Sequence, residues 1–136
     1  MDEQVKSKLL EAAAQALENA YSPYSGISVA AAVMDDRGRI FSGVNVENAS
    51  LGLTICAERN AIARAVADGA KSIEAVLIIS SIGAIPPCGA CRQVIAEFAM
   101  PETPILLAFE GKIIEERTLG ELLPDAFKLN RDKGRS

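Results

Sequence analysis

The sequence predicts an α/β protein in which helices cover both faces of one mixed sheet of about five strands, a three-layer α/β/α arrangement. Two observations lead to this prediction. Segments with helical spacing of apolar residues alternate with short apolar runs, in the order αββαβαββα. The chain also has 136 residues, of which 49% are hydrophobic, enough for one domain with its own core. We expect residues 1–127 to form that domain and residues 128–136 to be a frayed tail.

The first half of the chain is expected to form a helix, a β-hairpin and a loop. Apolar residues recur at helical spacing from the start, and Pro23 ends that pattern. Two β-rich runs follow, and the stretch between them, at 35–38, has the composition of a hairpin turn. The expected elements are a helix at 4–20, strands at 27–34 and 39–46, and a loop at 47–55.

The second half alternates helices with strands. The run at 75–80 is continuously apolar, which is typical of a strand covered on both faces. The connection at 110–112 is too short for a parallel crossover, so the last two strands should form an antiparallel hairpin. Thr118 and Glu121 have the spacing of a capping box. The expected elements are a helix at 57–68 with Val66 on its inward face, strands at 75–80, 104–109 and 113–117, a helix at 89–99, and a short helix that ends at Pro124.

Charge and hydropathy exclude several classes of partner. The formal net charge is −4, and lysine and arginine are scattered, apart from a locally basic tail at 128–135. A protein that binds nucleic-acid phosphates usually has a basic face, so no nucleic-acid partner is expected. No apolar run approaches the roughly 18 residues of a membrane helix and no export signal opens the chain, which predicts a cytoplasmic protein without membrane contact.

Three cysteines and the absence of histidine restrict the possible chemistry. Without histidine there is no Ser-His-Asp triad, no Cys-His nucleophile pair and no imidazole metal ligand. An odd number of cysteines in a reducing compartment also argues against a disulfide framework. What remains for the cysteines is burial, redox chemistry or an all-thiolate metal site.

Cys56, Cys88 and Cys91 could together bind one zinc ion. Cys88 and Cys91 are three residues apart around an expected helix start, which brings two sulfurs to one side. With Cys56 they would give three thiolates and an open fourth position for water, the arrangement typical of catalytic zinc. The residues alone leave other interpretations open: a redox pair, a buried cysteine beside an unrelated pair, or a structural site closed by a carboxylate.

Two charged residues follow Cys56 in the expected helix start. Glu58 is a candidate proton shuttle, since a carboxylate beside zinc-bound water can take its proton and pass it to a substrate nitrogen. This role requires Cys56 to be the non-helical N-cap, because residues two apart on a helix do not face the same way. Arg59 could donate hydrogen bonds to the sulfurs. The alternatives are an acid placed in a first helical turn for dipole reasons and an exposed arginine.

Four ordered blocks of sequence are highly specific when taken together. They are Tyr-Ser-Pro-Tyr-Ser at 21–25, Gly-Val-Asn-Val-Glu-Asn-Ala at 43–49, Cys-Ala-Glu-Arg at 56–59 with Pro-Cys-Gly-Ala-Cys-Arg-Gln at 87–93, and Glu-Leu-Leu-Pro-Asp-Ala-Phe at 121–127. These blocks resemble the small-subunit, homotetrameric cytidine deaminases. The resemblance implies a cytidine deaminase-like fold, Zn²⁺ held by Cys56, Cys88 and Cys91, proton transfer by Glu58, and neutralisation of thiolate charge by Arg59.

The resemblance also implies which residues contact the substrate. Asn45 and Glu47 would bind the ribose hydroxyls, and the backbone of Ala57 would contact the pyrimidine ring. Phe127 would reach into the pocket of a neighbouring subunit in the homotetramer. Ile27 stands where relatives usually place a phenylalanine against the substrate, so ring stacking is lost there while an apolar wall remains.

These expectations predict an enzyme of pyrimidine salvage, a hydrolase that acts on the C–N bond of a cyclic amidine. Water would add to C4 of free cytidine or deoxycytidine and ammonia would leave, giving uridine or deoxyuridine. One alternative is a deaminase of a cytosine nucleoside antibiotic, similar to blasticidin deaminase, which the change at Ile27 keeps open. The others are a deaminase of cytosine within RNA or DNA and a non-catalytic zinc or redox protein.

Overall fold

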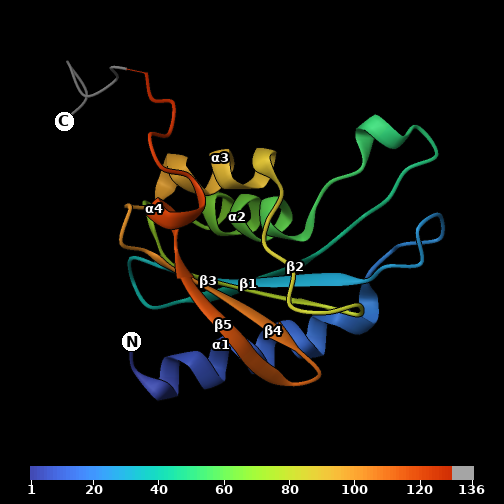
Figure 1. Ribbon diagram of the computed structural model, residues 1–136, viewed down its shortest axis with the longest axis horizontal. Helices are drawn as coiled ribbons and strands as arrows, with labels where there is room; N and C mark the ends of the chain where they lie inside the picture. The colour runs from blue at the N-terminus through green and yellow to red at the C-terminus, as the bar shows by residue number, and fades with distance from the viewer. Residues whose placement is uncertain (130–136) are drawn as a thin grey trace.

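The computed structural model describes residues 1–129, whose helices and strands form three layers (Figure 1). The predicted α/β/α class and the order αββαβαββα are confirmed. Most of the expected tail, residues 130–136, lies outside the described residues. In chain order the elements are α1 (Glu3–Ala16), the 3₁₀ turn η1 (Leu17–Asn19), β1 (Val29–Asp35), β2 (Ile40–Val44), the 3₁₀ turn η2 (Leu51–Leu53), α2 (Ala57–Ala67), β3 (Ile73–Ser80), α3 (Gly89–Phe98), β4 (Pro104–Phe109), β5 (Lys112–Thr118) and α4 (Leu119–Leu122).

The sheet is mixed, with its five strands in the order β2-β1-β3-β4-β5. β3 pairs with β4 in parallel, and the other neighbours are antiparallel, including the predicted β4–β5 hairpin. β3 lies in the middle, and every residue from Ala75 to Ser80 is buried. This central position explains the continuous apolar run at 75–80, because helices cover the strand on both faces.

Helix α1 covers one face of the sheet, and α2, α3 and α4 cover the other (Figure 1). Successive strand residues point to opposite faces, so each strand contributes to two separate cores. The cores are centred on Leu9, Ala13, Ala30, Ala32 and Leu77 on the α1 side, and on Ala31, Val33, Ala61, Ile78 and Ile95 on the α2 side. Within residues 1–129, no helix is long and apolar enough to cross a membrane.

Two features of the helices differ from the prediction. The α-helical part of α1 ends at Ala16, because the chain tightens into η1 and then turns so that Tyr21 can pair with Val46. Val66, expected on the inward face of α2, is 40% exposed. The buried face of α2 consists of Ala57, Glu58, Ala61, Ile62 and Ala65, and Val66 lies about 110° around the helix from the centre of that face.

The strand and loop predictions were accurate to within a few residues. β1 begins at Val29, two residues late, because the Ile27 carbonyl accepts a hydrogen bond from the Asn45 side chain (2.8 Å) instead of joining the strand ladder. The expected loop at 47–55 contains η2. The capping box is confirmed: the side chains of Thr118 and Glu121 each accept from the other's backbone N–H.

Candidate metal centre and active site

The three cysteines meet where two helices begin. Cys56 is the N-cap of α2 and Cys88 is the N-cap of α3, both with extended backbone (φ −72°, ψ 155° and φ −67°, ψ 169°). Neither side chain caps its own helix, so both sulfurs are free to face a common point. Cys91, in the first turn of α3, is buried. The three Sγ atoms all lie within 4.8 Å of one another, so the fold brings together residues that are 35 positions apart in sequence, from 56 to 91.

The arrangement of the sulfurs fits a zinc ion. Zinc–sulfur bonds of about 2.3 Å in a tetrahedron separate neighbouring sulfurs by about 3.8 Å. The sulfurs of Cys88 and Cys91 are 3.5 Å apart, and small side-chain rotations would bring Cys56 to the same spacing. No carboxylate oxygen of residues 1–129 belongs to this cluster, which leaves the fourth position open. The donor set is thus that of a catalytic zinc site with three thiolates.

The three thiols differ in acidity. The hydrogen bond with the Cys91 thiol, together with the hydrogen bond and positive charge of Arg59, lowers the pKa of the Cys56 thiol to about 5. The same sulfur–sulfur hydrogen bond raises the pKa of Cys91, whose thiol is also buried and lies near the Glu58 carboxylate. Cys56 is therefore the more acidic of these two thiols, and a metal ion bound by Cys91 would have to displace the Cys91 proton.

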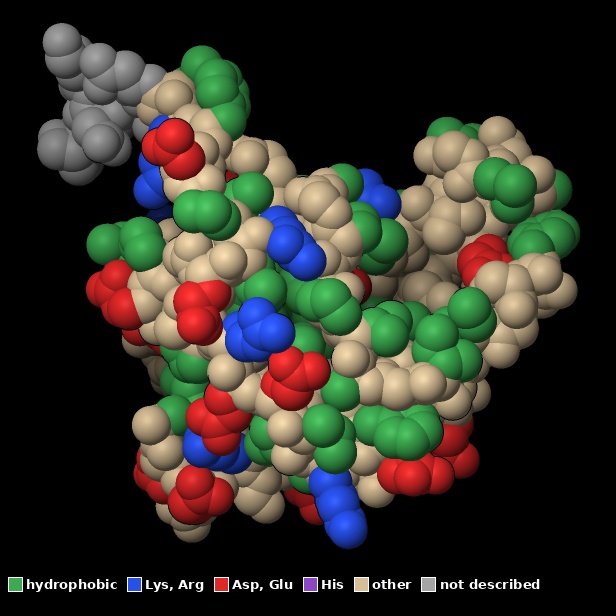
Figure 2. Space-filling model, in the orientation of Figure 1, with side chains coloured by type: hydrophobic (Ala, Val, Ile, Leu, Met, Phe, Trp, Pro, Cys, Tyr) green, Lys and Arg blue, Asp and Glu red, His purple; other side chains and the backbone are tan. Residues whose placement is uncertain are grey.

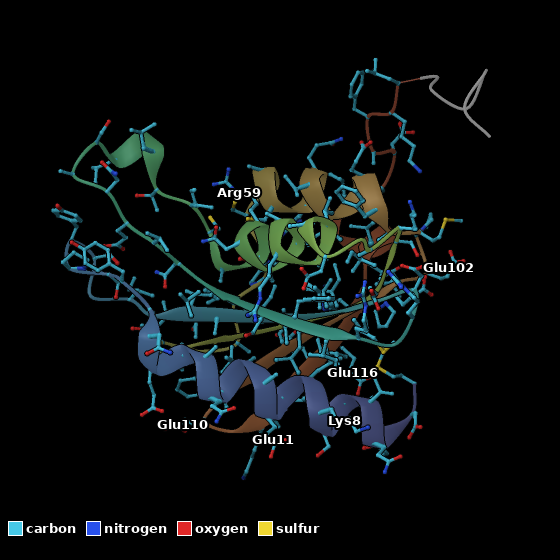
Figure 3. The ribbon with its side chains drawn as sticks, turned by 180° about the vertical axis from the view of Figure 1, so that it is seen from behind. Lys8, Glu11, Arg59, Glu102, Glu110 and Glu116 are labelled. Carbon is cyan, nitrogen blue, oxygen red and sulfur yellow. The ribbon has the colours of Figure 1, made fainter. Side chains whose placement is uncertain are left out.

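Arg59 supplies the positive charge beside the cluster. From the first turn of α2 its Nη2 donates to Cys56 Sγ at 3.8 Å and to the Thr54 carbonyl at 3.3 Å (Figure 3). The hydrogen bond to Cys56 and the charge of the cysteines raise the pKa of the guanidinium. Three thiolates would bring more negative charge than a divalent ion neutralises, and the Arg59 guanidinium lies where it would offset part of that excess.

Glu58 is a nearly inaccessible carboxylate next to the sulfurs. Its exposed fraction is 5%, and it lines the same cavity as Cys56 and Cys88. Both Cys56 and Glu58 reach that cavity because Cys56 lies at the N-cap, outside the regular turn of the helix. Burial, and then the negative charge of Cys56, raise the pKa of Glu58 above its ordinary value of 4.5. A raised pKa makes this carboxylate a better proton acceptor than an ordinary glutamate.

A cavity of about 210 Å³ adjoins the sulfurs. Its walls are mainly apolar and carry few polar groups, as is usual for small-molecule sites. Four of its lining residues, Val29, Thr54, Ile85 and Pro86, were not singled out in the sequence. The position of Ile85 and Pro86 directly before Pro87 and Cys88 was the available signal for two of them. The complete lining is Val29, Asn45, Thr54, Cys56, Ala57, Glu58, Ile85, Pro86 and Cys88.

Asn45 and Ala57 line this cavity, as expected of substrate-binding residues, and Ile27 does not. Asn45 is 8% exposed, and its side chain also has a structural task. Its Oδ1 accepts from the Val29 N–H at 3.0 Å, and its Nδ2 donates to the Ile27 carbonyl at 2.8 Å. Asn45 thus holds the segment before β1 against the end of β2.

Glu47 lies outside the cavity lining, where it holds the neighbouring loop. Its carboxylate accepts from the Ser25 hydroxyl, from the Ser25 N–H at 3.1 Å and from the Tyr24 N–H at 2.9 Å. The hydrogen bond from the Ser25 hydroxyl contributes most to lowering the pKa of Glu47. Three of about four acceptor positions on the carboxylate are therefore occupied, and one is left for another donor.

Phe127 is 69% exposed and is not part of the cavity wall of its own chain. Its carbonyl accepts a hydrogen bond from Gln93 Nε2 at 3.0 Å, which fixes the backbone while the ring faces outward. A large aromatic ring in this position is available to another molecule.

Three converging cysteine sulfurs, with no fourth protein ligand among residues 1–129 and with a buried carboxylate in the adjoining cavity, indicate the class of zinc-dependent hydrolytic enzymes. Residues 3–107 match the family described as the cytidine and deoxycytidylate deaminase zinc-binding region, and the chain belongs to this family.

Curated relatives and solved structures agree with this membership. The chain is 45% identical over 121 residues to a cytidine deaminase of Sporosarcina psychrophila, covering 88% of this chain and 89% of that one. It is 44% identical over 128 residues to one of Halalkalibacterium halodurans, covering 93% and 95%. A crystal structure of cytidine deaminase from Burkholderia pseudomallei has a TM-score of 0.84 and 42% identity, covering 93% of this chain and all of that one. A blasticidin-S deaminase of Bacillus cereus is 32% identical over 111 residues, covering 75% of this chain and 78% of that one.

Proposed function

We propose that this protein deaminates free cytidine and deoxycytidine, with water as the second reactant and uridine or deoxyuridine and ammonia as products. The observation that supports this most directly is the buried Glu58 beside three convergent sulfurs at a cavity of about 210 Å³. The cytidine deaminases similar to this chain match it over nearly its full length, which also supports the assignment.

Each polar group at the cavity has a task in this reaction. Cys56, Cys88 and Cys91 would hold a zinc ion, which would supply a Lewis acid that makes an attacking water more acidic. Glu58 accepts a proton from that water as the water oxygen bonds to C4, and delivers this proton to ring N3. It then carries the second proton of the water to the exocyclic nitrogen, so that the C4–N bond breaks and ammonia leaves. Arg59 keeps Cys56 in its thiolate form.

The substrate is positioned by groups around the same cavity. The backbone of Ala57 contacts the pyrimidine, and Asn45 and Glu47 bind the ribose hydroxyls. Asn45 can do so because one N–H of its amide is free after the bond to Ile27, and Glu47 because one acceptor position remains. Ile27 provides an apolar wall near the substrate once the pocket is complete.

The active form is proposed to be a homotetramer in which Phe127 completes the pocket of a neighbour. The segment 46–55 projects from the body of the chain in Figure 1, and Figure 2 shows hydrophobic side chains on its surface. Exposed fractions there are high for apolar residues: 70% for Leu51 and 65% for Leu53. Exposed apolar patches of this kind mark interaction surfaces.

We also propose that residues 1–127 act as one catalytic domain in the cytoplasm, in pyrimidine salvage. A reducing compartment keeps the three thiols available for metal.

A substrate panel with zinc-loaded protein tests the proposal. Ammonia release and loss of the cytidine ultraviolet band are measured with cytidine, deoxycytidine, blasticidin S and cytidine-containing oligonucleotides. Rapid turnover of the two free nucleosides is expected. Turnover of blasticidin S alone would replace the proposal with the antibiotic deaminase, which the relative from Bacillus cereus and the aliphatic Ile27 favour as second candidate. Bound zinc without any turnover would mark a non-catalytic protein.

A further inference from the structure

Arg92 connects two segments that are distant in sequence. It follows Cys91 in α3, and its guanidinium is partly buried. Nε donates to the Pro87 carbonyl at 2.7 Å, and Nη1 donates to the Leu122 carbonyl at 2.6 Å. Pro87 directly precedes Cys88, and Leu122 is the last residue of α4. One side chain therefore joins the loop that carries a proposed zinc ligand to the C-terminal segment.

The two bonds serve one carbonyl just before α3 and one carbonyl at the end of α4. Carbonyls in the last turn of a helix accept no hydrogen bond from within that helix, and they carry partial negative charge. A cation beside the Leu122 carbonyl is therefore favourable. The planar guanidinium offers donors in fixed directions and can bond two carbonyls at once, which an ammonium group does less well. Gln93, the next residue, adds its hydrogen bond to the Phe127 carbonyl at 3.0 Å.

We propose that Arg92 is a positioning residue that couples metal binding to the order of residues 119–127. Metal held by Cys88 and Cys91 fixes the start of α3, and with it Pro87 and the backbone of Arg92, whose N–H already donates to the Cys88 carbonyl at 3.0 Å. The guanidinium passes this constraint to Leu122. Because coupling is reciprocal, an ordered C-terminal segment also strengthens metal binding.

The inference rests on the proposed ligand set and has a consequence for the proposed tetramer. Phe127 lies on the segment that Arg92 and Gln93 hold. Loss of metal from one subunit would therefore disorder the ring that this subunit lends to its neighbour, so that an empty site weakens a second site that still contains metal.

Hydrogen exchange and metal affinity test this coupling without any substrate. Amide exchange in 119–127, where the Leu123 N–H bonds to the Leu119 carbonyl at 2.7 Å, is compared in zinc-loaded and chelator-treated protein. Removal of zinc should speed exchange there about tenfold, the factor for losing roughly one hydrogen bond to a charged group. In Arg92→Ala exchange should be fast with or without zinc, and zinc affinity in chelator competition should fall by a similar factor. Arg92→Lys, which keeps the charge, should lie between.

Arg64→Ala is the matched control, because Arg64 donates to a single carbonyl, that of Ser42, at 3.4 Å on the outer side of α2. It should leave both readouts unchanged. The proposal is overturned if zinc removal leaves exchange in 119–127 unaltered in the parent protein, or if Arg92→Ala and Arg92→Lys bind zinc as tightly as the parent. Since neither measurement uses cytidine, a failure of the deaminase assignment would not produce these outcomes.

Discussion

The position of Cys56 at the N-cap of α2 determines what the Glu58 side chain can reach. In the middle of a helix, residues 56 and 58 would face different directions. With Cys56 at the N-cap, the sulfur and the carboxylate instead line one cavity, and burial leaves Glu58 only 5% exposed. The helix start thus places the proposed metal ligand Cys56 and the proposed proton carrier Glu58 within three residues.

We predict that Glu58→Gln retains the fold and zinc but loses nearly all turnover. The amide has the same shape as the carboxyl group but cannot carry a proton, and general acid–base catalysis is worth about 10²–10⁴-fold. Steady-state rates on cytidine and zinc content by atomic absorption check this. Glu102→Gln, an exposed acid at the other end of the helical layer in Figure 3, is the control and should remain active. Substantial activity in Glu58→Gln would remove Glu58 from the mechanism.

At the residue scale, the sequence predicted the convergence of the three cysteines better than the lining of the cavity. Cys56 and Cys88 could be placed because each stands at a recognisable helix start, and in this fold the starts of α2 and α3 lie together. Thr54 and Ile85 could not, because they lie in irregular segments whose paths depend on tertiary contacts. The contacts of Glu47 with Ser25 were missed for the same reason.

At the scale of elements, α2 is held at both ends. The β1–β2 turn bonds its C-terminal end: Arg39 Nη2 donates to the Asp68 carbonyl at 3.0 Å, and Arg37 Nη2 to the Gly69 carbonyl at 3.4 Å. At the other end Asn60 Nδ2 donates to the Val44 carbonyl at 2.8 Å. The sequence predicted the β1–β2 turn and α2, but not these hydrogen bonds. No sequence pattern indicates which distant carbonyl an arginine or asparagine side chain will bond.

Asp35, at the start of the turn that holds α2, should make the free energy of unfolding depend on pH. Burial alone would raise the pKa of Asp35, but the N–H groups of Arg37 and Arg39 and the Arg39 guanidinium at 2.8 Å hold it below 3.8. A lowered folded-state pKa means that this stabilisation is complete above the unfolded-state value and is lost as pH falls through the folded-state value. Urea midpoints should therefore decline as the pH falls below the unfolded-state pKa of aspartate, about 3.9, and the loss should be complete below the folded-state pKa.

The variant Asp35→Asn separates this carboxylate from the others. It should be less stable than the parent protein at neutral pH, and its urea midpoint should decline less steeply in acid. Glu110→Gln, an exposed acid on the β4–β5 turn, serves as the control and should follow the parent curve. Parallel curves for Asp35→Asn and the parent protein would show that the acid sensitivity arises elsewhere.

Gly43 sets how closely β2 approaches the start of α2. A Cβ at this position would overlap the Ala61 nitrogen and lie 2.8 Å from the Ala57 carbonyl oxygen, and these are backbone atoms that cannot rotate away. Gly43→Ala should therefore push the first turns of α2 outward and cost about 1–3 kcal/mol of stability. The thiolate–cobalt absorption of a Co²⁺-substituted sample should change with it, because Cys56 moves with α2.

A control variant that is at least as destabilised, but whose α2 is undisturbed, makes this prediction specific. Leu9→Ala opens a cavity under α1, on the opposite face of the sheet, and should cost about 2–5 kcal/mol. Its cobalt spectrum should match that of the parent protein. If Gly43→Ala also gave the parent spectrum, the close approach would matter for packing alone and not for the metal centre.

At the scale of the whole molecule, a single chain leaves the proposed pocket unfinished. Its cavity lacks an aromatic residue, while Phe127 and the apolar segment 46–55 are exposed. If a neighbour supplies Phe127, each site takes Glu58 from one subunit and Phe127 from another. Co-expressed Phe127→Ala and Glu58→Gln subunits should then complement each other. A Phe127→Ala subunit keeps its own Glu58 and receives Phe127 from a Glu58→Gln neighbour. Random mixing in a closed assembly predicts recovery of about a quarter of parental activity. Pairing Phe127→Ala with the variant that carries both substitutions should restore no activity. Native mass spectrometry counts the mixed tetramers. If these tetramers form but stay inactive, Phe127 acts within its own chain.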